Sequence, residues 1–467
     1  MNTMQINKTL LTLCLALLVV AVPNDAFGRR KPCAGDKTVI VRDTVVVEKT
    51  DTVERERLVE VYNRPRVKTG IEVLRDSGFE CLKGKRVGLV TNPSGVDSRL
   101  RSTIDILHEA PEVNLVALFG PEHGVRGDIY AGGKVADFTD AATGLPVRSL
   151  YGATRKPTPQ MLSDIDVMVY DIQDVGTRSY TFISTLALVM RACAEQDIEV
   201  VVLDRPNPLG GNKVEGPYVE PGYFSFVSQF RIPYVYGLTV GEFANLINNE
   251  GLNRDQKGDQ AHLSCRLTVI PMEGWYRDML YTDTGLPWIL PSPNIPSPQA
   301  AIGYPSAGIC GDFSGFLNIG IGYTLPFQVF AAPWLDPDLL VEKLRSYDIP
   351  GVDFRVIYFT PFSGSMKGQL VKGVQYFYTD YDKAVLTLTQ FHVIQAVVEL
   401  YPERSPFEHS KTSAIFDKVC GSDGVRTLFG KAYKVSDLEG YWQKDVEHFR
   451  ALSAPYYLYG QSPAVPE

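Results

Sequence analysis

Charged and hydrogen-bonding side chains are concentrated in one short segment, directly after a short apolar run. Asp171, Gln173, Asp174, Arg178 and Tyr180 lie within ten residues. A carboxyl group that holds a proton, together with one that is ionised, can carry out acid–base chemistry. Amide, phenol and guanidinium groups can bind a polar substrate through directed hydrogen bonds. The segment is therefore predicted to form part of a site.

Three other apolar runs, at residues 86–91, 113–119 and 198–203, also end in polar and turn-forming residues. The side chains that follow them are Asn92 after the first run, Glu122, His123 and Arg126 after the second, and Asn207 after the third. In open α/β sheets, ligands bind beyond the carboxyl ends of the strands, near the point where the strand order reverses. We therefore expect the four loops to converge on one crevice. Turn chemistry explains any one of these loops equally well, but Glu122 is not a turn-forming residue.

The order of the predicted elements indicates an α/β fold. Strand-length apolar runs alternate with helical patterns over residues 67–285, which predicts a Rossmann-like, doubly wound parallel sheet domain. Residues 286–467 mix strands and helices and predict a smaller C-terminal α/β domain, with a cleft between the two domains. Further predicted elements are helices at 181–195, 239–249, 336–346, 384–400 and 438–451, and strands at 268–272, 354–359 and 373–378. The second helix begins with a capping box of Thr239 and Glu242, which gives this carboxylate a structural role.

The N-terminus has the pattern of a secretory signal. Lys8 precedes an apolar stretch at residues 10–22, and small residues follow near residue 28. The stretch is too short for a permanent membrane span. We therefore expect a signal peptide at 1–28, a spacer at 29–66, and a secreted or periplasmic protein with no integral membrane segment once the signal is removed. A self-pairing β or coiled segment is the alternative for the spacer.

Composition and missing motifs narrow the chemistry. The formal net charge of -8 argues against nucleic acid as a partner. The seven cysteines have no close spacing, so a dense disulfide framework is not indicated and any pairing is open. No dinucleotide-binding, P-loop, zinc-protease or nucleophile-elbow motif is found, and the six histidines lack metal-ligand spacing. We expect neither a cofactor nor a metal.

Several uncommon motifs occur together from Gly70 to the C-terminus. They include GLVTNPSGVD, LFGPEHGVRGD, YDIQDVGTRSYTF, LDRPNPLGG and WILPSPNIPS, in this order. In these motifs the chain resembles glycoside hydrolase family 171, the exo-β-N-acetylmuramidases. The resemblance implies a secreted or periplasmic enzyme that removes N-acetylmuramic acid from the non-reducing ends of peptidoglycan fragments.

Cleavage of a glycosidic bond usually needs one carboxyl group as acid and one carboxylate as nucleophile or base. We assign the acid to Glu122, in a Gly-Pro-Glu-His-Gly turn where a close wall would favour the protonated form; a loop-stabilising hydrogen bond is the alternative. The second group is Asp171, Asp174 or Glu215, and each aspartate could instead bind Arg178 or cap the next helix. Inverting, retaining and substrate-assisted routes all stay open, because they depend on a carboxyl separation that sequence does not give.

Binding roles follow from the types of donor. The lactyl carboxylate of muramic acid calls for a fixed cation, and Arg178 or Arg126 could supply it. Asn92, Asn207 and Tyr180 can bind hydroxyl or acetamido groups. We also assign His123, Gln173 and Asn294 to substrate binding, the last from a proline-rich passage at residues 287–305 that is otherwise a rigid connector between domains.

The chain departs from the family pattern at two positions. Many relatives carry a glutamate and an arginine where this chain has Ser314 and Ile321. The alternative function is therefore a non-catalytic protein that binds cell-wall sugars in the same cleft.

Overall fold

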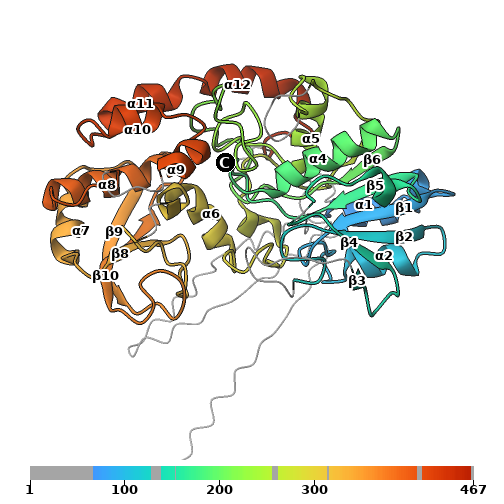
Figure 1. Cartoon of the computed structure of the whole chain (residues 1–467), viewed down its shortest axis with the longest axis horizontal. Helices are drawn as coiled ribbons and strands as arrows, with labels where there is room; N and C mark the ends of the chain where they lie inside the picture. The colour runs from blue at the N-terminus through green and yellow to red at the C-terminus, as the bar shows by residue number, and fades with distance from the viewer. Residues whose placement is uncertain are drawn as a thin grey trace, which may run out of the picture. The chain divides into compact units, whose positions relative to one another are not determined.

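A seven-stranded sheet is built from the first part of the chain (Figure 1). Its spatial order is β3 (Phe138–Thr139), β4 (Pro146–Ser149), β2 (Asn114–Gly120), β1 (Arg86–Thr91), β5 (Val167–Asp171), β6 (Glu199–Leu203) and β7 (Leu267–Ile270). All neighbours are parallel except β3 and β4. The order runs outward in both directions from the β1/β5 pair, so the predicted doubly wound sheet is confirmed. The runs predicted at 86–91, 113–119 and 198–203 each form a strand within one residue of these bounds, and the apolar run that leads into Asp171 forms β5.

The computed structural model describes residues 67–127, 138–152, 154–254, 261–312, 315–407 and 413–463. The predicted signal peptide and spacer lie outside these residues. Residues 66–467 form one compact unit, and the domain boundary predicted at residue 285 stays a prediction. None of the described helices is both long and apolar enough to cross a membrane. Among the described residues, none of the five cysteines forms a disulfide bond.

Helices flank this sheet. They are α1 (Gly70–Asp76), α2 (Thr103–Glu109), α3 (Pro159–Leu162), α4 (Phe182–Glu195) and α5 (Val240–Asn249). Helix α4 is buried along nearly its whole length, as its apolar sequence requires. The capping box predicted for α5 is confirmed, and Glu242 is fully buried with its carboxylate 2.8 Å from the guanidinium of Arg277. This carboxylate therefore has the structural role predicted for it.

A smaller antiparallel sheet follows in the chain, in the order β8 (Val329–Ala332), β10 (Val371–Tyr378) and β9 (Val352–Phe359). The helices of this region are α6 (Pro298–Ala307), α7 (Pro337–Arg345), α8 (Thr389–Leu400), α9 (Ser413–Cys420), α10 (Gly424–Phe429), α11 (Ser436–Gln443) and α12 (Val446–Ser453). The predicted smaller α/β region is thus confirmed. Apolar residues of both sheets, among them Val202 and Val374, belong to one buried core.

Three predicted elements differ from the structure. The helix expected at 384–400 becomes α-helical only at Thr389, after a short 3₁₀ turn at Leu386–Leu388. The helix expected at 438–451 is divided into α11 and α12, and at the break the Asp445 carboxylate accepts a hydrogen bond from the backbone N–H of Tyr218, 2.9 Å away. The proline-rich passage ends in a helix, because Ser297 caps the backbone N–H of Ala300 at 3.2 Å and Pro298 takes the first helical position.

Candidate active site

A cavity of 180 Å³ lies beside the carboxyl ends of β2 and β5. Its wall combines one carboxylate and one imidazole with hydroxyl, amide and aromatic groups. The lining residues are Glu122 and His123 after β2, Ser179, Tyr180, Thr181 and Phe182 after β5, Ser292, Asn294 and Ile295 of the proline-rich passage, Tyr304 of α6, and Phe327. The cavity is smaller than the roughly 300–1,000 Å³ typical of sites for drug-sized ligands.

The turn that carries Glu122 has an unusual backbone. The N–H of Gly124 donates to the carbonyl of Pro121 at 3.0 Å, and both His123 and Gly124 have positive φ, 74° and 73°. A left-handed conformation is uncommon for a residue other than glycine, and such positions cluster at functional sites. The turn holds Glu122, which is half-buried, and His123, which is buried, in the same wall.

Tyr180 is held among other aromatic and hydroxyl groups of the wall. Its ring meets Phe182 and Tyr304 edge-on, with centroids 5.1 and 5.6 Å apart. Burial raises the pKa of its hydroxyl well above 10, an effect that the Ser292 hydroxyl partly offsets. Next to it, Ser179 lies 2.8 Å from the hydroxyl of Tyr234. Tyr180 is therefore a neutral phenol in the cavity wall.

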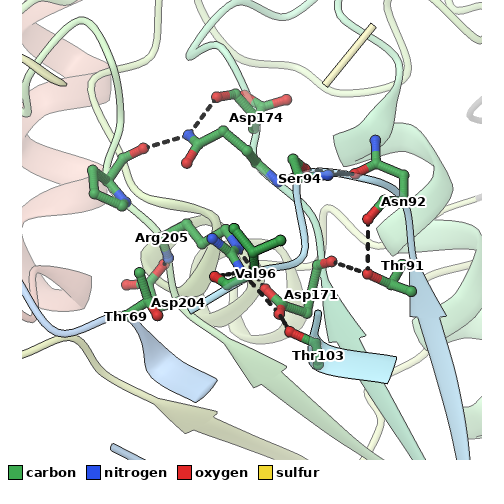
Figure 2. Close-up of polar contacts among 12 residues, drawn as sticks. Thr69, Thr91, Asn92, Ser94, Val96, Thr103, Asp171, Asp174, Asp204 and Arg205 are labelled. Atoms are coloured by element: carbon green, nitrogen blue, oxygen red, sulfur yellow. Dashed lines mark hydrogen bonds and ion pairs between the residues drawn. The ribbon is translucent and has the colours of Figure 1, made fainter. Parts of the chain in front are cut away.

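The point where the strand order reverses is filled by a buried ion pair, as Figure 2 shows. Asp171 accepts from Arg205 at 2.5 Å on one oxygen and 2.9 Å on the other, and also from the hydroxyl of Thr103. Arg205 further donates to the carbonyl of Val96 at 2.8 Å. The described side chains leave a void of 10 Å³ beside this pair. This volume is barely enough for one water molecule. The crevice expected at this point is therefore closed, and the open cavity lies nearer the loop after β2.

Asp174 has a different environment from Asp171. One of its oxygens accepts hydrogen bonds from the Tyr236 hydroxyl and, at 2.7 Å, from the N–H of Gly176. The other oxygen is buried and has no hydrogen-bond partner in the described part of the chain. Burial raises the pKa of this carboxyl to about 7, although the Tyr236 hydroxyl and the backbone N–H groups of Gly176 and Val175 oppose the rise. At neutral pH Asp174 can therefore hold or release a proton.

Glu215 lies away from the cavity lining. Its carboxylate accepts from the backbone N–H groups of Leu386 and Thr387 at 3.0 and 2.9 Å, and from the hydroxyl of Thr387 at 2.7 Å. These three bonds attach the segment after β6 to the turn that precedes α8.

Both arginines predicted to bind the lactyl carboxylate have partners within the protein. The guanidinium of Arg178 is fully buried and donates to the carbonyls of Pro217 at 2.9 Å, Ile232 at 2.6 Å, Val419 at 3.1 Å and Cys420 at 2.8 Å. Arg126 makes two 3.0 Å bonds to Asp140 and holds the pKa of that carboxyl at about 2. Neither arginine lines the cavity.

The predicted amide side chains Asn92, Asn207 and Gln173 connect loops to one another. Asn92 donates to the carbonyl of Pro291 at 3.1 Å and accepts from the N–H and hydroxyl of Ser94, and its bonds to Ser94 are drawn in Figure 2. Asn207 donates to the carbonyl of Leu238 at 2.9 Å. Gln173 donates to the carbonyls of Asp174 and Pro206, at 2.8 and 2.7 Å.

The structure thus brings Glu122, His123, Tyr180 and Asn294 of the predicted residues together in the cavity wall. Nothing in the sequence assigns a role to Tyr304, which lies in helix α6, or to Phe327, which precedes β8. Ser179 and Thr181 are the sequence neighbours of Tyr180, so they could have been predicted as site residues from the sequence.

Ser314 and Ile321 are the two departures from the family pattern. Ser314 lies outside the described residues, and Ile321 is partly buried and packs against the main core. Within the described residues no group of three or more acidic, histidine or cysteine side chains could hold a metal ion.

The chain matches two family models over most of its length. The model described as the exo-β-N-acetylmuramidase NamZ N-terminal domain matches residues 87–299, and that for the C-terminal domain matches residues 302–459. The peptidoglycan β-N-acetylmuramidase NamZ of Bacillus subtilis strain 168 is 44% identical over 396 residues, which are 85% of this chain and 92% of that protein.

Two solved structures have the same fold, and both are crystal structures of DUF1343-family proteins from Bacteroides fragilis. The first is 54% identical with a TM-score of 0.79, and the match covers 85% of this chain and 100% of that one. The second is 28% identical with a TM-score of 0.64, and covers 85% and 99%. The chain therefore belongs to the exo-β-N-acetylmuramidase NamZ family, and thus to the glycosidases.

Proposed function

We propose that the protein is an exo-acting glycosidase that releases N-acetylmuramic acid from the non-reducing ends of peptidoglycan fragments, with Glu122 as the general acid. One observation carries the proposal: Glu122 is the one carboxylate that lines the cavity of the described residues. The family to which the chain belongs and the Bacillus subtilis relative, named a peptidoglycan β-N-acetylmuramidase, support the substrate class.

The wall supplies the contacts that such a sugar needs. The rings of Tyr304 and Phe327 offer apolar surface to a sugar face or an acetamido methyl group. Ser179, Ser292 and Asn294 offer hydrogen bonds to hydroxyl, acetamido or lactyl oxygens. With Arg126 and Arg178 bound to protein groups, we assign the lactyl carboxylate to these hydroxyl and amide donors.

In the proposed hydrolysis, Glu122 gives its proton to the glycosidic oxygen as the bond to the anomeric carbon breaks. A water molecule supplies the hydroxyl group that the anomeric carbon gains, and its other proton returns to the carboxyl groups of the enzyme. Asp171 and Glu215 have all their oxygens occupied by protein donors, whereas Asp174 retains an unpaired oxygen. Asp174, like Asp171 and Glu215, does not line the cavity. Among the three predicted carboxylates we favour it as the second group on its unpaired oxygen alone. The alternative is that the acetamido oxygen of the substrate attacks its own anomeric carbon. In that case no protein carboxylate is needed as nucleophile, and Glu122 still acts as the acid.

Because its substrate lies outside the cytoplasm, we propose that the chain acts as a secreted or periplasmic protein after loss of residues 1–28. Finding the mature protein in a cytoplasmic fraction of the native cell would contradict this location.

The function is tested with two sets of peptidoglycan fragments, one ending in N-acetylmuramic acid and one ending in N-acetylglucosamine at the non-reducing end. We expect free N-acetylmuramic acid from the first set alone, measured by mass spectrometry. Binding of the first set without release, measured by calorimetry, would instead support a non-catalytic sugar-binding protein.

A further inference from the structure

We infer that Trp288 is a positioning residue for the substrate, because its indole N–H closes the loop that carries Ser292 and Asn294 into the cavity wall. The inference rests on the glycosidase function proposed above. Trp288 itself is not among the residues that line the cavity. It therefore acts through the backbone of the loop and not through a contact with the sugar.

The sequence of this loop favours a tight turn at residues 292–295. Serine at the first position, proline at the second and asparagine at the third are residues that β-turns prefer. The N–H of Ile295 donates to the carbonyl of Ser292 at 3.0 Å, as such a turn requires. Ser292 and Asn294 are half-buried in the cavity wall, whereas Pro293 between them is exposed. The turn thus presents its two hydrogen-bonding side chains to the cavity.

A hydrogen bond at each end holds the turn in place. At its last residue, the indole Nε1–H of Trp288 donates to the carbonyl of Ile295 at 3.0 Å and joins the two ends of the loop. Just before the turn, the amide of Asn92, which follows β1, donates to the carbonyl of Pro291 at 3.1 Å. Asn92, Pro291 and Ile295 are all buried. The turn is therefore attached both to its own loop and to the parallel sheet.

The indole ring is itself held by Tyr281. The two rings meet edge-on with centroids 4.6 Å apart, and the Tyr281 hydroxyl donates to the carbonyl of Pro287, directly before Trp288, at 2.9 Å. Prolines at positions 287, 291, 293 and 296 further restrict the backbone of the loop. Few hydrogen bonds are therefore enough to hold the loop in one conformation.

A preformed wall lowers the free-energy cost of binding a sugar. Hydroxyl and amide groups that already have the bound geometry lose less conformational freedom when the ligand arrives. We expect Ser292 and Asn294 to hold the sugar equally in the ground state and the transition state, because Glu122 supplies the proton from the loop after β2. Loss of their positioning should then raise KM and leave kcat nearly unchanged.

The test compares the wild-type chain with Trp288→Phe and with Trp442→Phe. Both changes keep an aromatic ring and remove an indole N–H, and that of Trp442 donates to the hydroxyl of Thr387 at 2.7 Å, away from the cavity lining. With a peptidoglycan fragment that ends in N-acetylmuramic acid, we expect KM to rise about tenfold in Trp288→Phe, with kcat within about twofold of the wild type.

Trp442→Phe is the control for stability. Trp442 is fully buried, so this variant should lose at least as much stability in urea as Trp288→Phe while it keeps the wild-type KM. An unchanged KM in Trp288→Phe, or an equal rise of KM in both variants, would overturn the inference.

Asn92→Asp tests the second attachment of the turn, and it carries the test if Trp288→Phe does not fold. The carboxylate keeps an acceptor for the N–H and hydroxyl of Ser94 and removes the donor to Pro291. We expect the same rise in KM at an unchanged kcat. A fall in kcat alone would contradict the positioning role.

A further measurement does not depend on turnover. The chain has four tryptophans, so their indole N–H signals can be resolved by ¹H–¹⁵N NMR and assigned by their loss in the two phenylalanine variants. Titration with free N-acetylmuramic acid is expected to shift the signal of Trp288 and to leave that of Trp442 in place. A shift in a protein without hydrolase activity would reject the proposed function but keep the positioning role. Hydrolysis of the fragment with no change in the Trp288 signal would reject the positioning role alone.

Discussion

Asp171, the last residue of β5, and Asp174, in the segment that follows, lie three positions apart but meet different partners. Asp171 faces the guanidinium of Arg205, with bonds of 2.5 and 2.9 Å, and so forms part of the framework under the site. Asp174 faces the neutral hydroxyl of Tyr236 and a backbone N–H. A buried carboxyl without a cation is protonated more readily, so Asp174 is the residue of this loop whose charge is expected to change near neutral pH.

This difference predicts how stability depends on pH. The pKa of Asp174 is about 7 in the folded protein and 3.8 in its ordinary state, so between these values the folded chain binds more protons than the unfolded chain. The free energy of unfolding should then fall as pH rises from about 4 to 7. Asp174→Asn keeps an acceptor for Tyr236 and removes the charge. In urea denaturation across this range we expect a shallower fall for Asp174→Asn, and an unchanged slope would contradict the assignment.

At the scale of elements, the end of α9 is held by a side chain from a distant loop. The last turn of a helix leaves carbonyl groups without partners inside the helix, and Arg178 donates to two of them, those of Val419 and Cys420. The same guanidinium holds the carbonyls of Pro217 and Ile232. Arg178 therefore joins the loop after β5 to the C-terminal helices.

Replacement of Arg178 by alanine should act on stability first. Four buried carbonyls would lose their donor, and we expect a loss of about 3 kcal/mol or more in the free energy of unfolding, measured by urea denaturation. Arg231→Ala is the control, because that side chain is exposed and lies over the ring of Tyr218. A stable Arg178→Ala protein with weaker binding of muramic substrates only would instead support the binding role predicted from the sequence.

The strands could be predicted and most of their loop contacts could not. Residues 86–91 and 198–203 are apolar because both faces of a parallel strand are covered, and this requirement is visible in any short stretch of sequence. The partners of Arg178 are 39 to 242 positions away in the chain, and nothing local distinguishes an arginine that binds carbonyls from one that binds a substrate. Glu122 and His123 were found because a charged residue in a glycine- and proline-rich turn has no obvious structural use.

At the scale of the whole molecule, several side chains join the sheet of β1–β7 to the later part of the chain. Glu215 binds Thr387, and the hydroxyl of Tyr459 donates to Asp204 at 2.5 Å. The main core contains residues of both sheets. The cavity also takes its lining from both regions, so the site requires them to be folded together.

We therefore expect residues 67–463 to unfold in one cooperative transition. In scanning calorimetry the calorimetric and van't Hoff enthalpies should agree, and Tyr459→Phe should lower the transition temperature without splitting the peak. Two resolved transitions would show that the predicted domains unfold independently.

The role of Glu122 is tested most directly by Glu122→Gln with two N-acetylmuramides, one with an activated aryl leaving group and one with N-acetylglucosamine as leaving group. A poor leaving group needs the acid more, so we expect kcat/KM for the disaccharide to fall by about a hundredfold or more, with a clearly smaller loss for the aryl substrate. Glu215→Gln, an isosteric change away from the cavity, should retain the wild-type preference between the two substrates. Equal losses of Glu122→Gln on both substrates, or no loss on the disaccharide, would contradict the assignment of Glu122 as the general acid.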